Sequence, residues 1–240
     1  MRINRYLASA GFGSRRKCEE LVREKKVRLN GGVVTALSTV IQEGDQVDVG
    51  GQVAKLASPQ YYLLYKPRGV VCTLSDEQGR TSICDLLPFH AGRLFHVGRL
   101  DMESEGLILL TNDGDFAQKL AHPTQGIEKE YEVVVDQPFD STLLPKLCQG
   151  FMIVGGRAKA ERAFMLGANK IKVVLRQGIK RQIRLMFAKL GYKVKRLVRT
   201  RIGGFTVNKL RPGQWRQLRA KDLSSWAEPT AKRPRLNPMN

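Results

Sequence analysis

The 240-residue chain is poor in the residues that build metal sites and disulfide frameworks. It has four widely spaced cysteines with no C-x-x-C pair, and three histidines with no spacing typical of zinc ligands. It also lacks an apolar run of about 18 residues and a signal-peptide pattern at its start. The sequence therefore predicts a cytoplasmic protein with no metal, no disulfide framework and no membrane segment.

Two further absences concern glycine spacing and acidic residues. The Gly-Gly pairs do not fall in the G-x-G-x-x-G or Walker spacing, which argues against a nucleotide cofactor and against a methyltransferase with a glycine-rich donor loop. Residues 162–221 contain eighteen Lys and Arg and no Asp or Glu. Because this stretch still alternates apolar and basic residues, it is expected to fold with a positive face, whereas a surface built for solubility mixes both signs. With a net charge of +19, the chain is expected to bind nucleic acid.

The first 50 residues are predicted to form a small α-α-β module. An amphipathic helix is expected over 2–10, and Ser14 is a suitable N-cap for a second helix over 15–25. A strand over 27–31 ends in an Asn-Gly turn, and a further strand covers 46–49. Arginines directly after a helix N-cap favour phosphate contact. The residues expected to contact RNA are Arg2, Arg5, Ser14, Arg15, Arg16 and Lys17.

Residues 51–59 are predicted to be a linker, 60–226 a second domain, and 227–240 a basic, disordered tail. Many strands and few helices indicate an α+β fold, with a large mixed, mostly antiparallel sheet flanked by helices. The predicted strands cover 61–67, 68–74, 95–98, 107–111, 130–136, 151–154, 158–165, 170–176, 193–199 and 214–218, and the predicted helices 83–87, 115–121, 141–149 and 180–190.

Asp101 is the residue that points most directly to chemistry. It is the only acid in the turn Gly98-Arg99-Leu100-Asp101, and the apolar run 107–110 behind it is typical of a buried strand. A carboxylate at the edge of a core, beside a fixed cation, is expected to stay ionised and to keep its direction. The alternative for so short a motif is a turn cap or a surface pair with Arg99.

Seven short motifs follow one another behind the module, at 65–71, 98–101, 111–115, 120–123, 129–131, 181–186 and 197–203. The module contributes four matching stretches of its own, at 2–7, 14–16, 27–31 and 44–47. In this order they resemble the family of ribosomal RNA pseudouridine synthases that carry an N-terminal S4 module. The resemblance covers residues 1–220, which is nearly the whole chain.

The resemblance implies an enzyme that isomerises a uridine to pseudouridine on a nucleotide flipped out of paired RNA. Nothing is oxidised or added, so no cofactor and no metal are expected. Asp101 matches the catalytic aspartate, Tyr131 the tyrosine that stacks on the base, and Arg184 the basic residue that pairs with the aspartate. Whether Asp101 first attacks the ribose or removes a proton stays open. The implied substrate-binding residues are Arg99, Leu185, Lys66, Arg181 and Gln182.

The sequence departs from the family pattern in one loop. The usual Glu-Gly-Arg-Asn before the Arg-Gln pair reads Gln177-Gly178-Ile179-Lys180 here. The following Arg-Gln-Ile-Arg is intact, so the departure concerns loop contacts to RNA near Ile179 rather than catalysis.

The expected partner is ribosomal RNA or a pre-ribosomal particle, bound by a monomer. Residues 62–69 and the order of the C-terminal motifs favour the large-subunit RNA over the small-subunit RNA, and the S4 module makes transfer RNA a weaker candidate. The main rival is a non-catalytic RNA-binding or ribosome-assembly protein on the same scaffold. The set Asp101, Tyr131 and Arg184 argues against it, because binding alone needs no shielded carboxylate.

Overall fold

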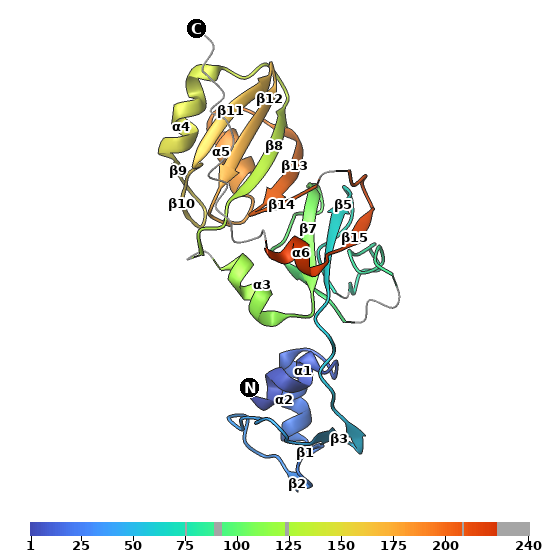
Figure 1. Cartoon of the computed structure of the whole chain (residues 1–240). Helices are drawn as coiled ribbons and strands as arrows, with labels where there is room; N and C mark the ends of the chain where they lie inside the picture. Colours follow the sequence, from blue (N-terminus) through green and yellow to red (C-terminus); the bar gives the residue numbers. More distant parts are fainter. Residues whose placement is uncertain (75, 89–92, 123–124, 208, 225–240) are drawn as a thin grey trace. The chain divides into compact units, whose positions relative to one another are not determined.

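A computed structural model describes residues 1–74, 76–88, 93–122, 125–207 and 209–224 of the chain (Figure 1). The predicted tail over 227–240 lies outside these residues, as do His90 and Pro123. Contacts divide the chain into two units, the first made mainly of residues 1–60 and the second of most of the residues that follow. None of the helices in these ranges is both long and apolar enough to span a bilayer.

The first unit contains two helices and a four-stranded sheet of order β2-β1-β3-β4. The predicted N-cap is confirmed, since Ser14 Oγ accepts a hydrogen bond of 3.1 Å from Lys17 N. The predicted turn is confirmed as well, because Asn30 and Gly31 both have positive φ, as a type I′ hairpin requires. The elements are α1 (Ile3–Ser9), α2 (Arg15–Arg23), β1 (Val27–Leu29), β2 (Gly32–Val33), β3 (Val47–Val49) and β4 (Gln52–Val53).

The packed part of the first unit extends past residue 50. Strand β4 pairs with β3, and Ala54 is buried in the same apolar core as both helices. The segment predicted to be a linker therefore begins as part of the sheet. The buried core residues of this unit are Ile3, Leu7, Cys18, Val22, Val27, Val34, Ile41, Val47 and Ala54.

The second unit is built on a nine-stranded sheet with the order β11-β12-β8-β13-β7-β5-β15, in which β14 pairs with β13 and β6 with β7. The described ladders are antiparallel except the one between β7 and β13, so the expected mixed, mostly antiparallel sheet is confirmed. The strands are β5 (Tyr61–Lys66), β6 (Phe95–Val97), β7 (Glu105–Thr111), β8 (Lys129–Val135), β11 (Arg162–Gly167), β12 (Lys170–Leu175), β13 (Val194–Ile202), β14 (Phe205–Thr206) and β15 (Trp215–Gln217).

Helices and a hairpin flank this sheet (Figure 1). Helix α5 contacts β9 and β13, and α4 contacts β11. Helix α4 follows a 3₁₀ turn at Ser141–Leu143 that Asp140 caps by accepting a hydrogen bond from Thr142 N. The remaining elements are α3 (Gly114–Ala121), α4 (Leu144–Gln149), β9 (Phe151–Ile153), β10 (Gly156–Ala158), α5 (Gln182–Lys189) and α6 (Ala220–Ser224).

Two predicted elements, the strand over 68–74 and the helix over 83–87, are wrong. Gly69 turns the chain with φ 86° and donates its N–H to Met102 O, which leaves a single bridge between Val71 and Ser82 in place of a strand. In the second segment, the Asp85 carboxylate accepts hydrogen bonds from both the backbone N–H and the hydroxyl of Ser82. Such local side-chain bonds compete with helix formation, and the region ends before Pro88 as a single turn.

The parallel contact between β7 and β13 depends on Gly106. This residue has φ 108° and lies opposite Arg199, so close that a Cβ atom would overlap the Arg199 backbone. Only glycine allows both the positive φ and this approach. The contact brings the start of β7, and the loop before it, next to the middle of β13.

Candidate active site

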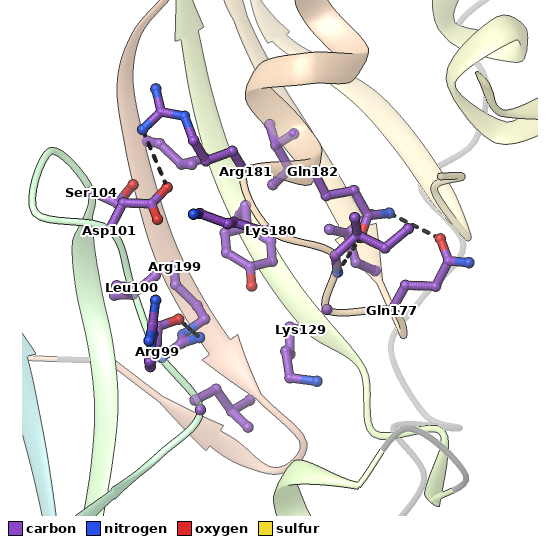
Figure 2. Close-up of a pocket in the computed structure, with 18 of the residues that line it drawn as sticks. Arg99, Leu100, Asp101, Ser104, Lys129, Gln177, Lys180, Arg181, Gln182 and Arg199 are labelled. Carbon is purple, nitrogen blue, oxygen red and sulfur yellow. Dashed lines mark hydrogen bonds and ion pairs between the residues drawn. The ribbon is translucent and has the colours of Figure 1, made fainter. Parts of the chain in front are cut away.

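A cavity of about 420 Å³ opens in the second unit, within the size range of ligand sites (Figure 2). Its walls are the loop between β6 and β7, the first residues of β8, the middle of β13 and the segment before α5. Asp101 is the one acidic side chain among the described lining residues. The cationic lining residues are Arg99, Lys129, Lys180, Arg181 and Arg199.

Asp101 lies on the loop between β6 and β7, with its side chain partly exposed. Its Oδ2 is 3.9 Å from Arg181 Nη1, an ion pair drawn in Figure 2. Arg181 immediately precedes α5 in a left-handed conformation, with φ 56° and ψ 24°. Non-glycine residues held in this conformation cluster at functional sites. Arg181 Nη2 is also 3.5 Å from Glu103 Oε2, so this one side chain contacts two carboxylates of the loop.

Arg184, expected to pair with Asp101, makes other contacts in the structure. Its Nη1 donates to Val194 O at 3.0 Å and its Nη2 to Glu103 O at 3.3 Å. It lies outside the cavity lining, and burial lowers the pKa of its guanidinium. The described ion pair of Asp101 is thus with Arg181, whereas Arg184 holds the backbone of the loop that carries Asp101.

Lys66 and Leu185, expected to bind substrate, also lie outside the lining. Lys66 is fully buried, and its ammonium donates to Pro67 O at 2.9 Å, Met102 O at 3.3 Å and Ser104 O at 2.7 Å. Burial lowers the pKa of this ammonium. The three acceptors use every N–H of the ammonium, so Lys66 links the end of β5 to the backbone of the Asp101 loop.

Arg199 is a third cation, besides Arg184 and Lys66, that contacts the backbone near Asp101. It is 2% exposed, and it donates from Nε to Leu107 O at 2.8 Å and from Nη1 to Arg99 O at 3.3 Å. Its Nη2 has no hydrogen-bond partner among the described residues. With Lys66 and Arg184, it fixes backbone carbonyls of the segment before and at the start of β7, which is how a rigid site is supported.

The segment before α5 is held by two side-chain amides, of which Gln182 was an expected site residue (Figure 2). Gln182 Nε2 donates to Gln177 Oε1 at 3.0 Å and to Lys159 O at 3.2 Å. Gln177 in turn accepts from Lys159 N at 3.0 Å and donates to Arg157 O at 3.1 Å. Gln177, one of the residues at which the sequence departs from the family pattern, is therefore part of the cavity wall.

Lys129 is a lining residue that belongs to the motif 129–131 but is not among the site residues expected from the sequence. It stands two residues before Tyr131 on β8, and alternate residues of a strand point to the same face. Both line the cavity, and Tyr131 is 9% exposed. Burial, together with the charge of Arg199, lowers the pKa of the Lys129 ammonium. The spacing from Tyr131 was the signal available in the sequence.

The residues expected to contact RNA in the first unit lie on its surface, apart from the half-buried Arg5. Arg2 is exposed at the N-cap of α1, and Arg15 and Arg16 are exposed in the first turn of α2. Ser14 uses its hydroxyl to cap α2, and Lys17 forms an exposed ion pair of 3.7 Å with Glu20.

Comparison with known proteins gives matches over most of the chain. Residues 60–189 match the family model described as RNA pseudouridylate synthase, and residues 1–47 match the S4 domain. The chain is 38% identical over 223 residues to ribosomal large subunit pseudouridine synthase B of Bacillus subtilis, covering 90% of this chain and 91% of that protein. It is 33% identical over 226 residues to an uncharacterized RNA pseudouridine synthase of Aquifex aeolicus, covering 93% and 94%. The crystal structure of a pseudouridylate synthase superimposes with a TM-score of 0.69 at 27% identity, covering 94% of this chain and 99% of the other.

Proposed function

Because the chain belongs to the S4-domain-containing RNA pseudouridine synthases, which are isomerases, we propose that it converts a uridine of large-subunit ribosomal RNA to pseudouridine. The choice of RNA is supported by the similarity to the Bacillus subtilis protein, which is named a large subunit pseudouridine synthase. The run of basic residues over 162–221 and the exposed arginines of the S4 domain supply charges for a phosphate backbone.

The observation that carries the proposal is a single carboxylate, Asp101, in a cavity whose other charged lining residues, among those described, are cations and which Tyr131 also lines. In the reaction, the C1′–N1 bond breaks and its electron pair leaves with the uracil, so positive charge builds on the ribose. C5 then bonds to C1′, a proton leaves C5, and a proton is gained at N1. We place Asp101 at the ribose, where its charge opposes the developing positive charge whether it attacks C1′ or removes the 2′ proton.

Tyr131 and the cations at the cavity then have complementary roles. Tyr131 offers its ring to the flipped base, and stacking repays part of the cost of unpairing. Arg99 and Lys180 are exposed lining residues, so their charges meet the phosphates on either side of the target nucleotide. Arg181 orients Asp101 directly, and Arg184 and Lys66 act through the backbone of its loop.

The test is pseudouridine mapping on both ribosomal RNAs from cells that lack the protein, complemented with wild type or with Asp101→Asn. Carbodiimide adducts read by primer extension locate each pseudouridine. We expect one site in the large-subunit RNA to disappear and to return only with wild type, because the amide carries no charge to act on the ribose. The Asp101→Asn protein should still bind the RNA.

Each other outcome contradicts a different part of the proposal. A lost site in the small-subunit RNA would make the assigned substrate wrong and leave the reaction correct. A site restored by Asp101→Asn would remove Asp101 from catalysis. No lost site in either RNA would point to transfer RNA, or to a protein that binds without modifying.

A further inference from the structure

The ammonium group of Lys129 stands in the cavity without a partner. It forms no hydrogen bond or ion pair with any residue that the structure describes, although its side chain is half-buried. Its nearest charged influence is Arg199, another cation, whose Nη2 also has no acceptor among the described residues. Two cations facing one cavity without a carboxylate beside them raise the free energy of the empty site. A ligand that brings negative charge to this end relieves that cost.

The strand register places Lys129 on the far side of Tyr131 from Asp101. Tyr131 lies opposite Arg199, which in turn lies opposite Gly106 near the start of β7. The Asp101 loop lies just before the first residue of β7. Lys129 pairs with Ile202, which follows Arg199 on β13, and β13 runs parallel to β7. Lys129 is therefore farther from the Asp101 loop than Tyr131 is. The step from Tyr131 to Lys129 is about 7 Å along the strand. Figure 2 shows the same separation, with Asp101 next to Arg181 and Lys129 toward the other end of the pocket.

This order fixes which part of the substrate meets Lys129, on the premise of the proposed function. With the ribose C1′ at Asp101 and the base stacked on Tyr131, the edge of the base opposite the glycosidic atom points toward Lys129. In uridine the glycosidic atom is N1, and the ring atom opposite N1 is C4, which carries O4. In pseudouridine the glycosidic atom is C5, and the ring atom opposite C5 is C2, which carries O2.

We propose that the Lys129 ammonium binds the carbonyl oxygen at this distal edge and stabilises the detached uracil anion. When the C1′–N1 bond breaks, the electron pair that moves to N1 is delocalised over O2 and O4. Turning the ring to bring C5 to C1′ exchanges the positions of these two oxygens, so a carbonyl faces Lys129 before and after the turn. After C5 bonds to C1′, the C5 proton passes to solvent and N1 takes up a proton from solvent, so the isomerisation has no net gain or loss of protons.

A lysine suits this position better than an arginine. Its ammonium is a compact charge on a flexible stem, with three donors that rotate, so it can follow an oxygen that moves. A guanidinium would impose one fixed fork on a ring that has to turn. A donor that meets charge developing in the transition state accelerates the chemical step rather than substrate binding.

The experiment compares wild type, Lys129→Met and Lys129→Arg under single-turnover conditions on a transcript that carries the mapped target as uridine or as 4-thiouridine. Chromatography and mass spectrometry of the digested nucleosides measure the product. We expect Lys129→Met to slow the chemical step about 100-fold with the Kd for RNA unchanged within about twofold. Lys129→Arg should recover part of the rate, because it keeps the charge.

The 4-thiouridine substrate gives the decisive readout. Sulfur is a weaker acceptor than oxygen, so the ratio of the uridine rate to the 4-thiouridine rate should differ by about tenfold between wild type and Lys129→Met. The same ratio in both enzymes, or a loss that appears in Kd and in its salt dependence, would mean that Lys129 holds a phosphate, and would overturn the assignment.

Two controls separate this proposal from the one before it. Lys146→Met removes a charge from the exposed surface of α4, outside the cavity lining and outside residues 162–221, and its rates should stay within about twofold of wild type. A wild type that makes no pseudouridine on the transcript contradicts the proposed function itself. A wild type that is active beside an equally active Lys129→Met contradicts only the role of Lys129.

Discussion

Lys66 and Lys129 both bring an ammonium group into the second unit, and the structure surrounds the two groups in opposite ways. Lys66 is fully covered and donates to three backbone carbonyls, two of them on the Asp101 loop. Lys129 lines the cavity and has no acceptor among the described residues. Burial lowers the pKa of both ammonium groups, so the direction of the pKa shift does not distinguish them.

The difference lies in the acceptors that each donor has. A buried charge whose donors are all used stabilises the fold, and its removal leaves the acceptors without partners. A charge that faces a cavity without acceptors from the protein contributes no such stabilisation to the free protein and stays available to a ligand. The same residue type therefore supports the loop at one position and meets the substrate at the other.

Among the variants that test the contrast between Lys66 and Lys129, we expect Lys66→Met to have the largest effect on stability. Three carbonyls would lose their donor, which costs about 3 kcal/mol at about 1 kcal/mol for each unpaired acceptor. Thermal unfolding followed by circular dichroism should show a Tm lower by several degrees, and turnover should fall because the Asp101 loop loses its support. Lys129→Met is the matched control, and its Tm should equal or exceed that of wild type.

The opposite pattern of stabilities would break the comparison. A Lys129→Met protein that unfolds at lower temperature than wild type would show that its ammonium already stabilises the free protein. A Lys66→Met protein with unchanged Tm would show that water replaces the ammonium under the loop.

A second pair of variants tests direct and indirect support of Asp101. Arg184→Met removes the donor to Glu103 O and Val194 O, and a shift of the loop by about 1 Å is enough to lower kcat about 100-fold. Arg181→Met removes an ion pair that is long, at 3.9 Å, and exposed, so a fall in rate of about fivefold is expected. Single-turnover rates on the mapped RNA measure both, with Tm as the readout of folding.

The reverse ranking is equally informative. If Arg181→Met lost more activity than Arg184→Met, the direct ion pair would control Asp101, and the backbone contacts of Arg184 would be secondary. Equal losses with equal falls in Tm would assign both residues to stability rather than to the direction of the carboxylate.

Local signals were enough to predict much of the fold. The Asn30-Gly31 turn and the Ser14 cap each depend on residues next to each other in the chain, and both are confirmed. The mixed sheet followed from strand-like runs, although the parallel contact through Gly106 needed the partner strand to be known. The failed helix over 83–87 shows the limit, because an Asp–Ser contact replaced the helical hydrogen bonds.

Motifs were enough to predict which residues belong to the site. Which of these residues pair with one another depends on distances that motifs do not give. Asp101, Tyr131, Arg181 and Gln182 do line one cavity, which their order in the sequence suggested. The choice between Arg181 and Arg184 as partner of Asp101 depends on the left-handed backbone at Arg181, which no periodicity reveals. Lys66 and Lys129 are both motif lysines in the sequence, and the structure separates them by their burial, by their place relative to the cavity and by their acceptors.

The smallest expected effect concerns Gln177, in the wall of the cavity. Gln177→Glu restores the residue typical of the family and keeps the oxygen that accepts from Lys159 N and Gln182 Nε2. It replaces the donor to Arg157 O with a carboxylate oxygen and adds a second negative charge to the cavity wall, so a loss of about 0.5–1 kcal/mol and a rate within about threefold of wild type are expected. Gln177→Leu is the control, since it also removes the acceptor of both donors, and its Tm should fall further. If the two variants had the same Tm and rate, the hydrogen bond that Gln177 donates to Arg157 O would matter more than the two bonds that it accepts. The cavity wall would then depend on a side-chain donor, as the Asp101 loop depends on Lys66.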